Sequence, residues 1–345
     1  MILQFKTYLT ALLLFFAFFG KGEAGLFRQP FEKPLVTEVL SYGMTVHNMN
    51  HSVAFYSDVL MFKKVADFTV SGSHIDTLFG LSNVKVRIVR MRLGEEYLQL
   101  MEFLSEKGRA IPHHTASNDR MFQHIAIVVS NMEQAYLALL KKGISHISSM
   151  PQQLPYSNPD IGGIEAFYFK DPDNHPLELI HFPPDKGNPK WQKPMNRLFL
   201  GIDHTAITVD NTRKSLNFYH TLLGLKVTEK HFNEGLEQER LTNVKGAKVQ
   251  ITSLRAEYGP GIELIQYLYP TSGHDMPLDT KPNDIWHWQI QLNTPTMNKT
   301  YEEIMQANMR FLSRGAVHLK NPQFAFREAF IVLDPDGHGV LIVNP

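Results

Sequence analysis

The 345-residue sequence contains no cysteine, and its 34 basic and 34 acidic side chains leave no net charge. Without a thiol, the chain can form neither a disulfide framework nor a cysteine-based nucleophile or metal ligand. Zero net charge, with no run of like charges, gives no electrostatic reason to expect nucleic acid or an anionic membrane surface as a partner. These absences leave a globular protein that relies on its core.

Only one apolar run stands out, from Tyr8 to Phe19 near the N-terminus. Lys6 precedes it, and Gly22 and Ala24 follow with the small side chains of a cleavage site. This layout predicts a signal peptide over residues 1–24, because the run is too short for a comfortable membrane span; an uncleaved anchor is the alternative. We therefore expect a periplasmic or secreted protein without membrane contact after cleavage, which suits a chain without disulfides in a bacterial periplasm.

The second half of the chain repeats the first at an offset of 163 residues. The segment SVAFYSDVLMFKKV, from Ser52, matches SLNFYHTLLGLKV, from Ser215. At the same offset His124 in FQHIAIVV matches His287 in IWHWQIQL. A repeat of this length indicates two copies of one domain.

We assign the two copies to residues 36–183 and 200–345, with a linker rich in Pro and Lys at 184–199. Each copy divides again, since His204 and His287 open similar segments 83 residues apart. The four modules share one pattern, in which an alternating strand is followed by an amphipathic helix and several further strands.

Local signals support this module. In the third module Asp210 or Asn211 can cap the helix, and Gly224 stands where a left-handed C-cap is expected. The first module carries Met61 at the position of that glycine. The motifs DPDNH and DPDGH precede the last strands of the second and fourth modules, and we interpret them as structural turns.

Four βαβββ modules with F-Y-x-x-x-L-G-like helices and D-P-D-G-H turns resemble the vicinal oxygen chelate superfamily. That superfamily includes glyoxalase I, methylmalonyl-CoA epimerase, extradiol dioxygenases and the bleomycin and fosfomycin resistance proteins. The resemblance covers nearly all of the mature chain. It implies an α+β fold of two tandem glyoxalase-like domains with cup-shaped mixed sheets, but not one reaction, because a fold does not determine function.

In this superfamily metal ligands lie on the first and last strands of a module, facing the cup. Alternation along the first strands places His124 and His204 opposite the helix-packing face. On the last strands Glu178 and Glu263 are flanked by apolar residues, where a carboxylate is costly unless it is paired or bound to metal.

The second and third modules therefore keep both ligand types. The first module has Ser41 and Gln99 at the equivalent positions, and the fourth has His287 and Leu341. His175 and His338 lie in turns, the pair His113-His114 lies in a loop and His181 falls on the face opposite Glu178, so we expect these five to be structural.

Two pairings of modules are open. If the second module faces the third, one cup holds the two-His, two-Glu set of glyoxalase I and the other cup has lost its set. If neighbouring modules pair, His204, Glu263 and His287 form a two-His, one-carboxylate site of the extradiol dioxygenase kind. The dioxygenase carboxylate comes from the last strand, where this chain has Leu341, so we favour the first pairing.

Imidazole and carboxylate ligands without thiolate suit a divalent metal ion: Zn, Ni, Mn, Fe or Co. The resemblance to glyoxalase I implies a metal-stabilised enediolate, with Glu178 or Glu263 as the base, as in lactoylglutathione lyase. We thus predict a metal-dependent lyase or isomerase for a small-molecule substrate with vicinal oxygens. An Fe(II) ring-cleaving dioxygenase and a non-enzymatic antibiotic-binding protein are the alternatives. One chain would hold a whole site, so we expect a monomer or homodimer.

Overall fold

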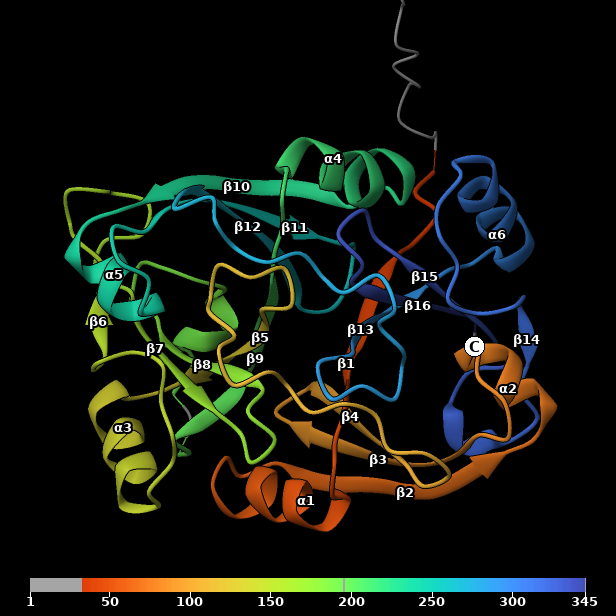
Figure 1. The fold of residues 1–345 in the computed structure, drawn as a ribbon. Coiled ribbons are helices and arrows are strands. Elements are labelled where there is room, and N and C mark those ends of the chain that lie inside the picture. Colours follow the sequence, from red (N-terminus) through yellow and green to blue (C-terminus); the bar gives the residue numbers. More distant parts are fainter. Residues whose placement is uncertain (1–32, 195, 345) are drawn as a thin grey trace, which may run out of the picture.

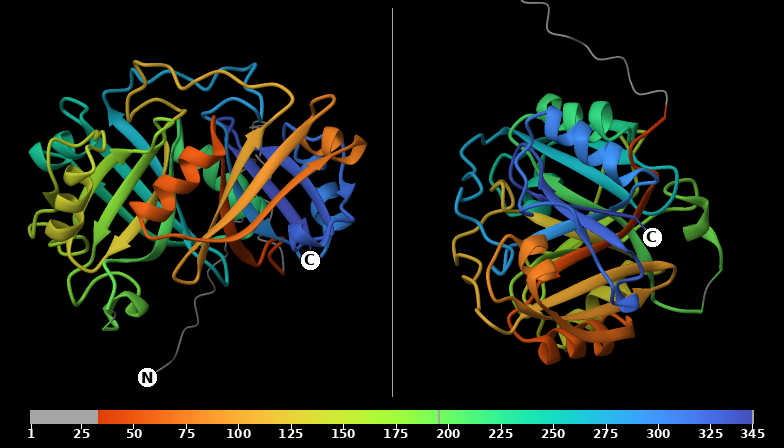
Figure 2. Two further views of the ribbon diagram at one scale, coloured as in Figure 1. Left: turned by 90° about the horizontal axis from the view of Figure 1, so that it is seen from below. Right: turned by 90° about the vertical axis from the view of Figure 1, so that its right-hand side faces the viewer.

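The computed structural model describes residues 33–194 and 196–344, so the predicted signal peptide lies outside the described residues. Among the described residues, none of the helices has the length and apolar character that a membrane crossing requires. The strands form two curved, mixed sheets of eight strands each, which lie side by side (Figure 2). The predicted α+β fold with cup-shaped mixed sheets is confirmed.

One sheet, called the central sheet here, consists of the second and third modules. Its strands in spatial order are β10 (Lys226–Asn233), β11 (Lys248–Arg255), β12 (Gly261–Tyr269), β9 (Phe199–Thr208), β5 (Gln123–Val129), β8 (Pro176–His181), β7 (Glu165–Lys170) and β6 (Gln152–Gln153). The two modules meet where β5 pairs antiparallel with β9.

The other sheet, called the terminal sheet, consists of the first and fourth modules. Its strands in spatial order are β14 (Val317–His318), β15 (Glu328–Leu333), β16 (Gly339–Asn344), β13 (Trp288–Asn293), β1 (Glu38–Thr45), β4 (Glu96–Phe103), β3 (Lys85–Leu93) and β2 (Lys63–Ser71). Here the two modules meet where β1 pairs antiparallel with β13.

Each sheet thus takes one module from each sequence copy, which confirms the pairing that we favoured. The pairing of neighbouring modules is wrong. The connections 104–122 and 270–287 carry the chain from one sheet to the other and pass over both (Figures 1 and 2). Charged contacts join the two connections, because Arg109 binds both Asp279 and Asp284.

Helices flank the sheets on their convex and their concave faces (Figure 1). They are α1 (Met49–Asp58), α2 (Ser73–Phe79), α3 (Met132–Lys141), α4 (Thr212–Leu216), η2 (Asn217–Leu222), α5 (Leu236–Thr242) and α6 (Met297–Gln306), with short turns η1 (Pro189–Gln192) and η3 (Pro322–Phe324). Asn211 caps α4, as predicted, by accepting a hydrogen bond from the amide of Lys214. Gly224 has a left-handed backbone at φ +89°, and Met61 adopts the same region at φ 63°.

The largest core cluster contains residues of both sheets and of the helices between them, including Ile127 of β5 and Ile207 of β9. Alternation along these strands leaves the neighbouring side chains on the concave face. The predicted assignment of faces is therefore confirmed, and the central cup receives the alternate residues of β5 and β9.

Candidate metal centre

The central cup brings the four predicted residues of the middle modules together. In the antiparallel pairing of β5 with β9, His124 lies opposite Ala206 and His204 lies opposite Ala126. Each imidazole therefore stands beside a methyl group that leaves it room. Glu178 on β8 pairs in register with Ala126, which places its carboxylate beside the same histidines.

The four side chains meet around one point. Glu178 Oε2 lies 3.1 Å from His124 Nε2 and 3.6 Å from His204 Nε2. Glu263 Oε2 lies 3.4 Å from His204 Nε2. One ligand atom each of His124, Glu178 and His204 falls within a mutual distance of 4.8 Å, a spacing that could hold a metal ion. Their role as ligands stays a prediction, but their convergence fits it.

The electrostatics of the cluster favour an ionised carboxylate. Burial would raise the pKa of Glu178, but hydrogen bonds and positive charge from His124 and His204 outweigh it and lower that pKa to about 2. Burial would lower the pKa of His204, but Glu263, Asp203 and Glu178 raise it well above its ordinary value. The donor set is thus a carboxylate between two imidazoles, which suits a divalent ion such as Zn, Ni, Mn, Fe or Co.

Residues that the sequence reasoning missed support this set. Asp203 contacts Nδ1 of His204 at 3.0 Å, and Arg255 Nη2 and Trp191 Nε1 donate to the same carboxylate. Ser253 donates to Glu263 at 2.9 Å. A search for a carboxylate near the second nitrogen of each histidine could have found Asp203, because metal-binding histidines commonly have such a partner.

The cluster lies in a cavity of about 910 Å³ in the concave face of the central sheet. Apolar side chains such as Ile164 and Phe182 and polar ones such as Lys186 and His231 line it. The cavity can therefore admit a small organic molecule to the point where the four side chains meet.

His287, the fifth predicted ligand, does not lie near the four residues of the central cup. It lies immediately before β13 on the terminal sheet, so the predicted set of His204, Glu263 and His287 is not formed. The position equivalent to Glu178 is Leu341, which packs with Phe324 and Phe326 in a cluster that fills this cup. Burial lowers the pKa of His287 to about 4. Its imidazole is therefore neutral at pH 7 in a cup that offers no carboxylate at this position.

The histidines of the two DPD turns are structural, as expected. His175 pairs with Asp171 at 2.8 Å and donates to the carbonyl of Ile285. His338 pairs in the same way with Asp334 and contacts the carbonyl of Arg120. Each turn therefore fastens one sheet to a connection between the sheets.

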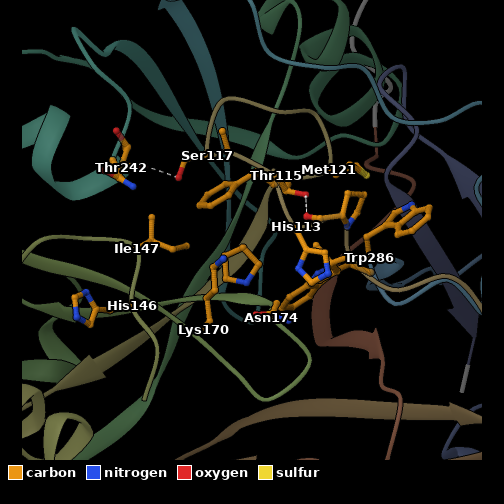
Figure 3. A pocket seen from close by; sticks show the side chains of 17 residues that line it. His113, Thr115, Ser117, Met121, His146, Ile147, Lys170, Asn174, Thr242 and Trp286 are labelled. Carbon is orange, nitrogen blue, oxygen red and sulfur yellow. Dashed lines mark hydrogen bonds between the residues drawn. The ribbon is translucent and has the colours of Figure 1, made fainter. Parts of the chain in front are cut away.

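A smaller cavity of about 240 Å³ lies between the two sheets (Figure 3). His113 of one connection, Trp286 of the other and Lys170 of β7 line it. Phe122 borders this cavity and packs against Tyr168, which borders the larger one. Its lining contains no carboxylate, so it does not compete with the central cup as a metal site.

Comparison with known proteins agrees with this geometry. The family model described as the Glyoxalase/Bleomycin resistance protein/Dioxygenase superfamily matches residues 38–179 and 201–342, and the chain belongs to this superfamily. No curated protein sequence matches the chain.

Several solved structures share the fold over nearly the whole chain. Glyoxalase I from Zea mays is 15% identical with a TM-score of 0.57, and the match covers 89% of this chain and 92% of that one. A candidate dioxygenase from Bacillus subtilis subsp. subtilis str. 168 is 11% identical with a TM-score of 0.56, covering 90% and 86%. At these identities the likeness shows the fold alone.

Proposed function

We propose that this member of the superfamily is an exported, metal-dependent lyase or isomerase for a small substrate with two vicinal oxygen atoms. The observation that carries the proposal is the convergence of His124, Glu178, His204 and Glu263 in one open cavity. The similarity in fold to maize glyoxalase I supports it.

His124, His204 and Glu178 would hold the ion, since their ligand atoms lie nearest to one another. A divalent ion bound there supplies Lewis-acid stabilisation of negative charge on a substrate oxygen. The cavity walls would orient the substrate, and the buried strands behind the imidazoles would exclude water from their inner sides.

Glu263 is the better placed of the two carboxylates to move a proton. Glu178 lies between both imidazoles with 7% of its side chain exposed, whereas Glu263 contacts one imidazole and is 19% exposed towards the cavity. Ser253 donates to Oε1 of Glu263, and Oε2 faces His204 at 3.4 Å on the side of the cavity. We infer that Glu263 takes the proton from the hydroxyl-bearing carbon next to a carbonyl group and returns it to the former carbonyl carbon, while the hydroxyl proton passes to the former carbonyl oxygen.

The test is proton exchange at carbon. The full chain, loaded in turn with each candidate ion, is incubated in D₂O with a panel of small enolisable hydroxyketones, and deuterium at carbon is followed by NMR. We expect exchange in the wild type and in His287→Ala, the control from the other cup. Glu263→Gln should keep metal and lose exchange, and Glu178→Gln should lose metal. Wild-type protein that binds no metal contradicts the proposal.

A ring-cleaving dioxygenase is a second candidate, because His124, His204 and Glu178 also form a two-His, one-carboxylate set of the kind that binds Fe(II) in oxygenases. It predicts oxygen consumption with a catechol by the Fe(II)-loaded protein and no exchange with ketones. Ligand binding without either reaction would favour the binding-protein alternative.

The proposal that the protein is exported rests on the sequence of residues 1–24 alone. We propose that this segment is a signal peptide that is removed on export. N-terminal sequencing of the protein from the periplasm or medium tests this, and a mature chain that still begins at Met1 in the cytoplasm contradicts it.

A further inference from the structure

The two histidines of the central cup are held in different ways. Nδ1 of His204 lies 3.0 Å from Oδ2 of Asp203. Among the described residues, no group forms a hydrogen bond with the buried Nδ1 of His124. The residue before it is Gln123, whose amide donates to Thr205 instead. The repeat therefore provides a carboxylate to one imidazole and none to the other.

Three donors fix the carboxylate of Asp203. Trp191 Nε1 donates to Oδ1 at 2.8 Å, and Arg255 Nη2 donates to Oδ2 at 2.9 Å, the oxygen that also faces His204. The side chain is buried and both of its oxygens are engaged. Rotation of the buried Asp203 side chain would break charge-assisted hydrogen bonds to both of its oxygens, so its position is well defined.

Trp191 belongs to the linker between the two sequence copies. It lies on η1, is buried, and packs against Ala126 of β5 and Leu200 of β9 in one apolar cluster. The ammonium group of Lys190 lies 4.2 Å from the centre of the Trp191 ring and pairs with Glu96 of the terminal sheet. The polar sequence of the linker is therefore fixed on the concave face of the central sheet, beside the metal centre.

We propose that Trp191, acting through Asp203, positions His204 as the firmly held metal ligand, which makes the linker a functional part of the centre. With Nδ1–H donated to Asp203, the lone pair of Nε2 faces Glu178 and Glu263. A carboxylate behind a ligating imidazole fixes its orientation and tautomer and raises its affinity for metal. Trp191 and Asp203 are positioning residues, and the inference rests on the proposed metal centre.

The experiment measures affinity for Co²⁺ alone, on the full chain stripped of metal, by competition with a chromophoric chelator. The absorption spectrum of bound Co²⁺ reports the ligand geometry. Trp191→Phe keeps an aromatic ring in the apolar cluster but removes the N–H donor, together with the part of the indole that a phenyl ring does not fill. We expect it to weaken Co²⁺ binding by about 10- to 100-fold and to alter the spectrum. Asp203→Asn, a second variant, should act in the same direction.

Lys190→Met is the matched control, because it removes the cation from the same ring and leaves the indole N–H in place. It should bind Co²⁺ like the wild type. Unchanged affinity and spectrum in both Trp191→Phe and Asp203→Asn overturn the proposal, and so does equal weakening in Trp191→Phe and Lys190→Met, which would mean that the linker acts by packing alone. A wild type that binds no Co²⁺ overturns the proposed metal centre instead, so the two failures are distinguishable.

Discussion

Replacing Glu178 by glutamine removes the carboxylate that lies between the two imidazoles. In the metal-free protein, burial opposes ionisation, but His124 and His204 lower the pKa of Glu178 from 4.5 to about 2. Because the folded pKa lies below the unfolded one, the ionised carboxylate stabilises the fold above pH 4.5, and this contribution is lost as the pH falls towards 2. A difference of this size corresponds to on the order of 3 kcal/mol of unfolding free energy at neutral pH.

Urea unfolding of the metal-free wild type and of Glu178→Gln, each at several pH values from 7 down to 3, measures this contribution. At pH 7 the variant should be the less stable protein, and the difference in unfolding free energy should narrow below pH 4.5, because the unfolded wild type then gains a proton on Glu178 while the folded protein keeps this carboxylate ionised. Subtracting the unfolding free energy of the variant from that of the wild type at each pH cancels, to first order, the contribution of the other titrating groups. A gap that stays constant from pH 7 to pH 3 would refute the coupling of Glu178 to its histidines.

Three further predictions concern the repeated turns. The backbone of Met61 is left-handed at φ 63°, and its side chain is 60% exposed. Met61→Gly should therefore raise the free energy of unfolding by about 1 kcal/mol. A lower free energy of unfolding in urea contradicts this. Gly224→Ala should lower it and the Tm, because the new Cβ would lie 2.6 Å from Pro34; an unchanged Tm contradicts the clash. Burial opposes but Asp334 raises the pKa of His338 above 6.5, so its stabilisation is complete below that pH and is lost as the pH rises through the raised value. His338→Gln should therefore show a flatter Tm profile above pH 6.5 than the wild type, and parallel profiles contradict this.

The sequence made the module and its faces predictable because those signals are local. Alternation along one strand was enough to place His204 and Ala206 on the cup face and Ile207 on the helix face. The cap at Asn211 and the left-handed residue at Gly224 depend on a few neighbouring residues and could be identified in the same way.

The pairing of the modules could not be decided with the same certainty, because both arrangements use the same local structure. Contacts between distant segments stabilise the observed one, such as Arg109 with Asp284 and His338 with the carbonyl of Arg120. The support of His204 by Asp203 was missed for a different reason. Strict alternation places adjacent residues on opposite faces, and only the structure shows the carboxylate close to the imidazole.

The two cups show that one module can hold either converging polar groups or a packed apolar cluster. At the carboxylate position the central sheet has Glu178, whose burial is costly without partners, whereas the terminal sheet has Leu341, whose full burial contributes roughly 2 kcal/mol. At the histidine position of the first module, the Ser41 hydroxyl donates a hydrogen bond to the amide oxygen of Gln291 across the junction of the two modules. Polar groups left to converge in the central cup are stable only if they are paired, as Asp203 is, or bound to an ion. The open cup therefore holds the converging polar groups on which the proposed chemistry depends, and the packed cup contributes buried apolar surface to the stability of the fold.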